Sequence, residues 1–280
     1  MIAMKNKELV KSAARLLVEL GITSPDEIDI EAIAFHCGAT VRYCPLVGCA
    51  ARIVGNEHKA IITVDSNSSG PRRRFSAAHE LGHWMYDRGS ASTSCQESSL
   101  LQEWTHSNLE SRANRYASDL LLPANLFAPL ARAAKAVDFT AVRALAETFR
   151  TSVTATAIRL VEHGPLPAIL VCYGKAGRKW FVRNSNIPEK LWPAQMPEAD
   201  TCACELLKAA KGPELKGDVP AGAWFQHPSA QRHYIYENSL QASRGDVLTL
   251  LWWKNEQMLI DYEEYEERLA ARRSDRRPEE

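Results

Sequence analysis

Two histidines and a glutamate stand at the spacing of a metal-binding helix. The segment from Ala77 to Trp84 contains His79, Glu80 and His83 in the pattern H-E-x-x-H. On a helix, this spacing places both imidazoles one turn apart on the same face, so that both can bind one ion. The carboxylate of Glu80 can then act as a general base toward an attacking water. The pattern predicts metal-dependent hydrolysis, with the peptide bond as the natural substrate.

The surroundings of this pattern favour a metal site over two surface histidines that align by chance. A polar turn at 65–71 precedes the motif, and the apolar residues Phe75 and Leu81 flank its histidines. Gly82 would allow another helix to pack closely against this one.

Two histidines leave a tetrahedral metal site short of one protein ligand. The known extension H-x-x-G-x-x-H is absent, because Tyr86 and Gly89 stand where it requires glycine and histidine. Glu110 opens the next helical segment, and the small residues Ala113 and Ala117 would let that helix approach the motif. We therefore choose Glu110 as the third ligand. The alternatives, each more typical of an ordinary exposed residue, are Asp87, Glu97, Glu103 and His106.

Apolar periodicity predicts the elements that must position these residues. One helix carries the motif, another carries Glu110, and a hairpin with its turn at 55–58 precedes both. The expected helices are 6–20, 30–36, 72–87, 108–122, 126–136, 139–149, 152–163 and 201–210. The expected strands are 47–54, 60–64, 168–173, 179–183, 232–236 and 246–253. These elements predict an α+β fold.

The segment 164–167, which is rich in proline and glycine, marks a boundary after the helical region. A mainly helical peptidase domain with a small sheet is expected before it, and a smaller α+β domain after it. The charged end of the chain is either a solvated helix or a frayed tail. The expected parts are a metallopeptidase domain at 1–124, a helix-turn-helix-like segment at 125–164, the second domain at 165–262 and the tail at 263–280.

Two segments together resemble the ImmA/IrrE metallopeptidases. The segment from Arg72 to His83 matches R-x-R-F-S/T-x-A-H-E-x-x-H, and that from Glu110 to Pro123 matches E-x-x-A-N-x-F/Y-A-x-x-L-L-x-P. The resemblance implies a zincin-like domain in which His79, His83 and Glu110 bind Zn²⁺, or Mn²⁺ in its place. It also implies a GAF-like fold for the second domain. Its implied substrate is a helix-turn-helix transcriptional repressor, whose cleavage relieves repression of stress-response genes or mobile elements.

The composition excludes several classes of protein. Lysine plus arginine and aspartate plus glutamate each number 34 in 280 residues, so no net charge favours nucleic acid or an acidic membrane. The longest strongly apolar stretch, 247–253, is far shorter than the roughly 20 residues of a membrane helix. The N-terminal residues lack a signal-peptide pattern, and the seven cysteines contain no C-x-x-C. We expect a cytoplasmic protein with reduced thiols.

The segment 139–163 has the outline of a helix-turn-helix, which makes DNA binding an alternative. Arg159 is the only basic residue of its second helix before His163, so packing or substrate docking is favoured over direct nucleic-acid binding. The alternative function is a non-catalytic regulator that binds a repressor or DNA and carries a structural metal site. A general digestive peptidase fits poorly, because no secretion signal is evident.

Two further features have both a structural and a functional interpretation. The run Arg72, Arg73 and Arg74 could steer an acidic segment of a substrate, although most such runs are solvated surface. Aromatic residues of the second domain are expected to form its core, with a small-molecule pocket as the alternative. They are Tyr173, Trp180, Trp192, Trp224, Tyr234, Tyr236, Trp252 and Trp253.

Overall fold

The chain folds into two compact units. The computed structural model describes residues 11–86, 88, 93–95, 109–209, 211–242 and 245–274. Unit 1 comprises Met1–Leu130 and Ala144–Thr156, and unit 2 comprises Ala131–Arg143 and Ala157–Glu280. Helices occur together with two separate sheets, so the predicted α+β class is confirmed. The division into units passes through the predicted segment 125–164, and the limits of that segment remain a prediction.

The first helices begin where side chains cap free backbone N–H groups. The hydroxyl of Ser12 accepts a hydrogen bond from the backbone of Arg15, and the carboxylate of Asp29 accepts one from Ala32. The prediction of a helix over 6–20 is therefore wrong at residues 11 and 12, because Ser12 caps the helix from outside, and 6–10 lie outside the described residues. The helices are α1 (Ala13–Glu19), α2 (Ile30–His36), α3 (Gly70–Tyr86) and α4 (Leu109–Leu121), with a 3₁₀ turn, η1 (Pro25–Glu27).

Unit 1 contains a sheet with strand order β1-β3-β2-β4. β2 and β3 form the predicted hairpin, in which Ile53 pairs with Ile62, and β1 lies parallel to β3. β1 and β4 are absent from the predicted strands. In β1 the residues Ala39, Val41 and Tyr43 alternate with polar Thr40 and Arg42, so the sequence carries a strand pattern that the prediction missed, although only Ala39 is fully buried. The strands are β1 (Ala39–Cys44), β2 (Ala51–Gly55), β3 (Ala60–Asp65) and β4 (Thr93–Cys95).

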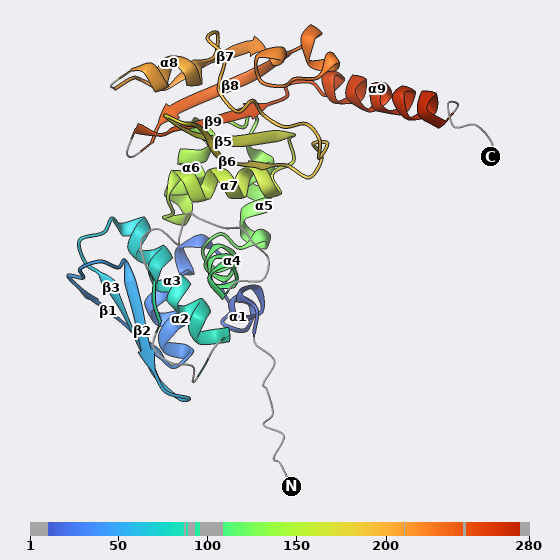
Figure 1. Cartoon of the computed structure of the whole chain (residues 1–280). Coiled ribbons are helices and arrows are strands. Elements are labelled where there is room, and N and C mark those ends of the chain that lie inside the picture. The colour runs from blue at the N-terminus through green and yellow to red at the C-terminus, as the bar shows by residue number, and fades with distance from the viewer. Residues whose placement is uncertain are drawn as a thin grey trace, which may run out of the picture. The chain divides into compact units, whose positions relative to one another are not determined.

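The motif helix α3 lies between the sheet of unit 1 and α4 (Figure 1). It packs on β1, β2 and β3 with one side and along α4 with another. Because neighbours cover it on two sides, its second half is buried from Ser76 to Trp84, polar residues included. The fold thus places the H-E-x-x-H segment inside the protein.

Three further helices follow, close to their predicted limits: α5 (Ala124–Ala133), α6 (Phe139–Phe149) and α7 (Val153–His163). Between α6 and α7, Arg150 has a φ of 54°. Among the described residues, no other residue except glycine has a positive φ. Its guanidinium donates a hydrogen bond to the carbonyl of Asp26. The left-handed residue ends α6, because the backbone N–H groups of Arg150 and Thr151 donate to the carbonyls of Glu147 and Ala146.

Unit 2 is built on an antiparallel sheet with strand order β6-β5-β9-β8-β7. β5 and β9 pair at its centre and are buried along their whole length. β7 is absent from the predicted strands, because Lys216, Asp218 and Pro220 give it the polar sequence of an edge strand. The strands are β5 (Ala168–Gly174), β6 (Gly177–Arg183), β7 (Leu215–Pro220), β8 (Tyr234–Gln241) and β9 (Val247–Trp252), and the helices are α8 (Cys202–Lys208) and α9 (Gln257–Ser274).

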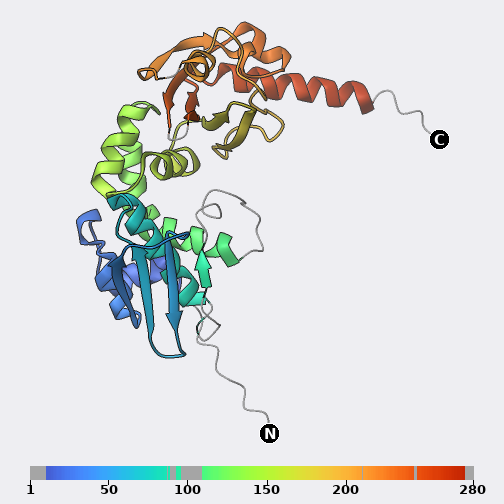
Figure 2. The same ribbon diagram turned by 60° about the vertical axis from the view of Figure 1, so that its left-hand side comes forward.

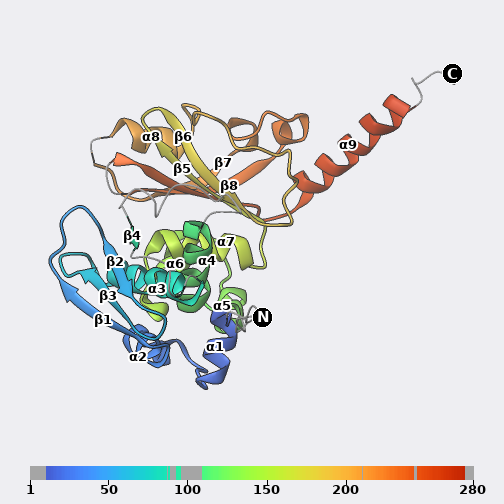
Figure 3. The same ribbon diagram turned by 60° about the horizontal axis from the view of Figure 1, so that its bottom comes forward.

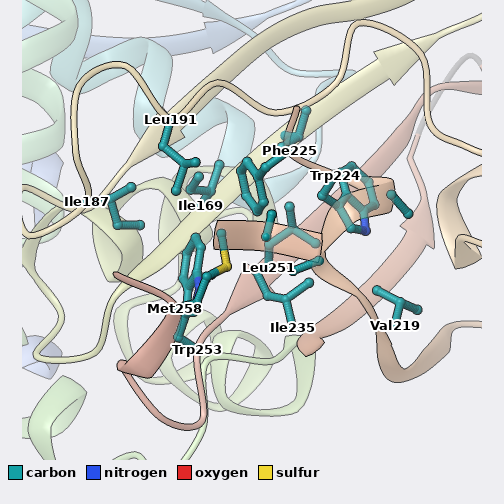
Figure 4. Packing of buried hydrophobic residues seen from close by; sticks show 14 of the residues in the cluster. Ile169, Ile187, Leu191, Val219, Trp224, Phe225, Ile235, Leu251, Trp253 and Met258 are labelled. Atoms are coloured by element: carbon teal, nitrogen blue, oxygen red, sulfur yellow. The ribbon is translucent and has the colours of Figure 1, made fainter. Parts of the chain in front are cut away.

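The aromatic residues of unit 2 divide between its core and its surface. Trp224 and Trp253 lie in a buried cluster with aliphatic side chains from β5, β8 and β9 (Figure 4). Tyr173 belongs to the same cluster. The prediction that aromatic residues form the core is confirmed for these three and is wrong for Trp192 and Tyr234, which are exposed.

The charged C-terminal segment is helical. The start of α9 is buried in unit 2 through Met258, Leu259 and Tyr262. The rest of α9 extends away from the sheet of that unit (Figures 2 and 3). Of the two expectations for the tail, the solvated helix holds for 263–274, and 275–280 lie outside the described residues. Neither α9 nor any other described helix combines the length and the apolar character that a membrane crossing requires.

Candidate metal centre

His79, Glu80 and His83 lie in the buried half of α3. Their exposed fractions are 1%, 0% and 4%. Polar and ionisable side chains at such depth cost several kcal/mol unless the protein or a bound ion compensates for the lost water. Their position contradicts the interpretation of two surface histidines.

Gly82 allows α4 to approach this part of α3. A Cβ atom at Gly82 would lie 3.0 Å from the Cα of Ala113 and 3.1 Å from its carbonyl oxygen. Since backbone atoms cannot move aside as a flexible side chain can, only glycine fits this crossing without a shift of one helix. The close approach brings Glu110, on the first turn of α4, to the two histidines.

Three side chains from α3 and α4 converge on one point. The Nε2 atoms of His79 and His83 are 3.1 Å apart. One carboxylate oxygen of Glu110 lies 3.2 Å from Nε2 of His79, and the other lies 3.4 Å from Nε2 of His83. Ligands at ordinary Zn–N and Zn–O distances around a tetrahedral ion are separated by about 3.3 Å. The spacing and the chemistry of this group therefore fit a zinc ion.

The charge state of Glu110 also suits a cation. Hydrogen bonding to His79 and then to His83 holds the pKa of the Glu110 carboxyl well below its usual range. The carboxylate is therefore ionised at neutral pH.

The region that contains this group matches a known protein family. Residues 36–161 match the family model for the IrrE N-terminal-like domain. This segment is an IrrE N-terminal-like domain. It includes α3 and α4 with the three converging side chains, and the family whose model it matches is linked to regulatory metallopeptidases.

A wider similarity of fold extends beyond the IrrE N-terminal-like domain. The chain is similar to the structure of a transcriptional regulator from Mycobacterium tuberculosis, with 15% sequence identity and a TM-score of 0.57. The similarity covers 86% of this chain and 74% of that one. Among curated proteins, none matches the sequence. An α+β unit thus follows the IrrE N-terminal-like domain, and the GAF-like assignment of that second unit remains a prediction.

The structure brings together the predicted residues His79, His83 and Glu110 of the IrrE N-terminal-like domain. Glu80 lies on the same buried half of α3. The alternative third ligands Asp87, Glu97, Glu103 and His106 lie outside the described residues.

One residue near the centre is absent from the predicted site. The Oδ1 atom of Asn114 lies 2.9 Å from Nδ1 of His79, the ring nitrogen that faces away from Glu110. A sequence signal for it exists, because Asn114 follows Glu110 by one helical turn and must share its face of α4.

The arginine run at the start of α3 has a structural role that its sequence does not predict. Arg73 donates a hydrogen bond to the carbonyl of Ser66, and its guanidinium lies 5.7 Å from the ring centre of Tyr43. Arg74 donates to the carbonyl of Ile28 through both terminal nitrogens, and burial lowers the pKa of its guanidinium. The expectation of solvated surface is wrong for these two arginines.

The helical pair at the end of the IrrE N-terminal-like domain offers little to a DNA groove. On α7, Arg159 is the basic residue before His163 that could contact DNA. Its side chain is buried. Its Nη1 atom lies 2.8 Å from Nε2 of His163. A side chain held inside the protein cannot read base edges, which favours a role in packing over DNA recognition.

Proposed function

We propose that this protein is a zinc-dependent endopeptidase that cleaves a helix-turn-helix transcriptional repressor and thereby relieves repression. The convergence of His79, His83 and Glu110 beside a fully buried Glu80 carries the proposal. Two imidazoles and one carboxylate are a ligand set of catalytic zinc sites, which keep a further position for water or substrate. Manganese, which accepts the same ligands, is the alternative ion.

The chemistry divides between the ion and Glu80. When bound, zinc polarises the scissile carbonyl and lowers the pKa of the attacking water. Glu80 takes a proton from that water and passes it to the leaving amine. Its exclusion from solvent strengthens the electrostatic interactions on which this transfer depends. His79, His83 and Glu110 would hold the ion beside Glu80.

The substrate class follows from the resemblance to the ImmA/IrrE metallopeptidases and from the family link to regulation. A regulatory peptidase of this kind acts in the cytoplasm, where a repressor meets DNA. In the proposed organisation, residues 1–124 form the peptidase domain, 125–164 the helical segment and 165–262 a GAF-like domain. The segment 263–280 is its charged tail.

The decisive experiment compares wild type with Glu80→Gln. Both proteins are assayed for bound zinc and incubated with the helix-turn-helix repressors encoded beside the gene, and products are identified by mass spectrometry. We expect equal zinc content and a loss of cleavage by roughly a hundred- to ten-thousandfold in the variant, because the general base is removed.

The other outcomes separate the alternatives. Equal zinc in both proteins without cleavage by either, together with stable capture of a repressor, would favour a binding regulator with a structural metal site. Equal cleavage by both proteins would remove Glu80 from the mechanism.

A further inference from the structure

The sheet of unit 1 has one covered face and one open face. α3 packs on the covered face, where the inward residues of β2 and β3 are buried. Because successive side chains of a strand point to opposite faces, the residues between them form the open sheet face. Its members are exposed, apart from the half-buried Thr63. They are Thr40 and Arg42 of β1, Arg52 and Val54 of β2, and Ile61 and Thr63 of β3.

The open sheet face carries two neighbouring rows of side chains. In one row, Arg42 and Arg52 both pair with Thr63, one from each side. Neighbouring strands are about 4.8 Å apart, so the two arginines are separated by about 10 Å. In the next row, Ile61 pairs with Val54, and these side chains are 40% and 56% exposed. The face thus combines a positive row with an apolar row.

The charges of the positive row are not neutralised by the rest of the chain. Within the described residues, no hydrogen bond or ion pair involves the guanidinium of Arg42 or Arg52. Asp65, the acidic residue on the outward side of β3, instead accepts hydrogen bonds from the backbone of Leu46 and Asn67. Both guanidinium groups are therefore available to another molecule.

We propose that the open sheet face docks an acidic amphipathic helix of a protein partner. Carboxylates bind guanidinium groups through paired, charge-assisted hydrogen bonds. On an α-helix, carboxylates at positions i and i+7 share a face and lie about 10.5 Å apart, which matches the spacing of Arg42 and Arg52. On one face of an extended strand, side chains recur at about 6.7 Å and fit this spacing less well. Apolar side chains of the intervening turn contact Ile61 and Val54.

Two other occupants fit the open sheet face less well. A second copy of this chain, packed face to face, would bring two arginine rows of like charge together. A single-stranded nucleic acid binds through a longer basic path and through aromatic side chains that stack on its bases. The outward residues of β1, β2 and β3 provide two arginines and no aromatic side chain. The proposal is independent of the metal site, whose ligands lie on α3 and α4.

The test measures the binding of fluorescein-labelled, lactam-stapled helical peptides to the full-length protein by fluorescence anisotropy at low ionic strength. The probe peptide carries glutamates at i and i+7 and leucines at i+3 and i+4. A comparison peptide of the same composition carries its glutamates at i and i+9, on opposite faces of the helix. We expect the comparison peptide to bind at least about fivefold more weakly than the probe, because only one of its glutamates can reach an arginine.

Substitutions in the protein test the positive row directly. The double variant Arg42→Ala, Arg52→Ala should bind the probe about tenfold more weakly, since it loses two exposed ion pairs. Arg115→Ala, on the exposed side of α4, is the matched control and should bind like wild type. The double variant Arg42→Glu, Arg52→Glu should lose the probe and bind instead the same peptide with lysines at i and i+7. This exchange of preference requires a folded protein and so separates docking from loss of structure.

Several results would overturn the proposal. They are the absence of binding of the probe to wild type, equal affinity for the probe and the comparison peptide, and unchanged affinity in the alanine double variant. Tighter binding of a single-stranded oligonucleotide than of the probe would assign the open sheet face to nucleic acid instead.

Discussion

Each unit of the protein contains a glutamate whose carboxylate contacts several polar groups. The contacts of Glu237 in unit 2 are hydrogen-bond donors of the chain, whereas those of Glu110 in unit 1 are two imidazoles. In unit 2, Glu237 on β8 is fully buried. Its oxygens accept hydrogen bonds from the backbone of Cys202 at 3.1 Å, the backbone of Ala203 at 2.7 Å and the hydroxyl of Ser239 at 2.8 Å. Glu237 thus ties the start of α8 to the sheet with donors that the chain supplies.

In unit 1, the carboxylate of Glu110 faces two imidazoles instead of a set of backbone donors. Imidazole nitrogens and carboxylate oxygens are all metal ligands, and their spacing suits one ion. The comparison teaches that burial of a carboxylate does not by itself mark a functional site. The chemistry of its neighbours separates a group that stabilises the fold from a group that binds a ligand.

The largest expected effect is on metal binding in unit 1. Glu110→Ala should weaken zinc binding by roughly a hundred- to a thousandfold, since each ligand of a zinc site contributes about 3 kcal/mol. Chelator competition measures this change, with Ser111→Ala on the same turn as the control. Zinc bound equally well by Glu110→Ala would place the third ligand elsewhere in the chain.

The matching change in unit 2 should affect stability and leave the metal site unchanged. Glu237→Gln weakens the hydrogen bonds to Cys202 and Ala203 and should lower the free energy of unfolding by about 2–3 kcal/mol. Urea unfolding followed by tryptophan fluorescence is weighted toward unit 2, which contains five of the seven tryptophans, the other two being Trp84 and Trp104 of unit 1. The control is Glu205→Gln on the exposed side of α8. A change in zinc affinity in Glu237→Gln would contradict the separation of the two groups.

Gly82→Ala should affect both stability and metal binding, because it separates α3 from α4. Alanine normally favours a helix over glycine, but here its Cβ meets the backbone of Ala113 at 3.0 Å. We expect a net loss of about 1–3 kcal/mol in the free energy of unfolding, together with weaker zinc binding. Gly70→Ala, at the open start of the same helix, is the matched control. A stabilised Gly82→Ala with normal zinc affinity would show that the helices tolerate a wider crossing.

The smallest expected effect is a pH dependence of unit 2. Burial raises the pKa of Glu237 above its ordinary value of 4.5, against the opposing hydrogen bonds from Ser239 and the backbone. The folded state therefore holds this proton more tightly than the unfolded state. Stability should fall as the pH rises from 4.5 through the raised pKa. Urea midpoints across this range should decline in the wild type relative to Glu237→Gln, and parallel profiles would show that the pKa is not raised.

Local features of the site follow from the sequence. His79 and His83 share a face because an α-helix turns once in about 3.6 residues, wherever that helix lies in the fold. The same rule links Glu110 to Asn114. The limits of α3 and the hairpin of β2 with β3 were predictable for this reason, since both depend on neighbours in the chain.

Other features were decided by the tertiary structure. β7 forms a strand by pairing with β8 at the edge of its sheet, although its sequence has a weak strand pattern, and only the fold shows that β1 lies parallel to β3. Only the packing of the fold shows that Glu110 lies next to His79 and His83. The same holds for the hydrogen bond from the backbone of Ala203 to Glu237 and for the one from Arg74 to the carbonyl of Ile28. These contacts join residues far apart in the chain. Their geometry depends on how whole helices and sheets pack, and no spacing along the sequence encodes that packing directly.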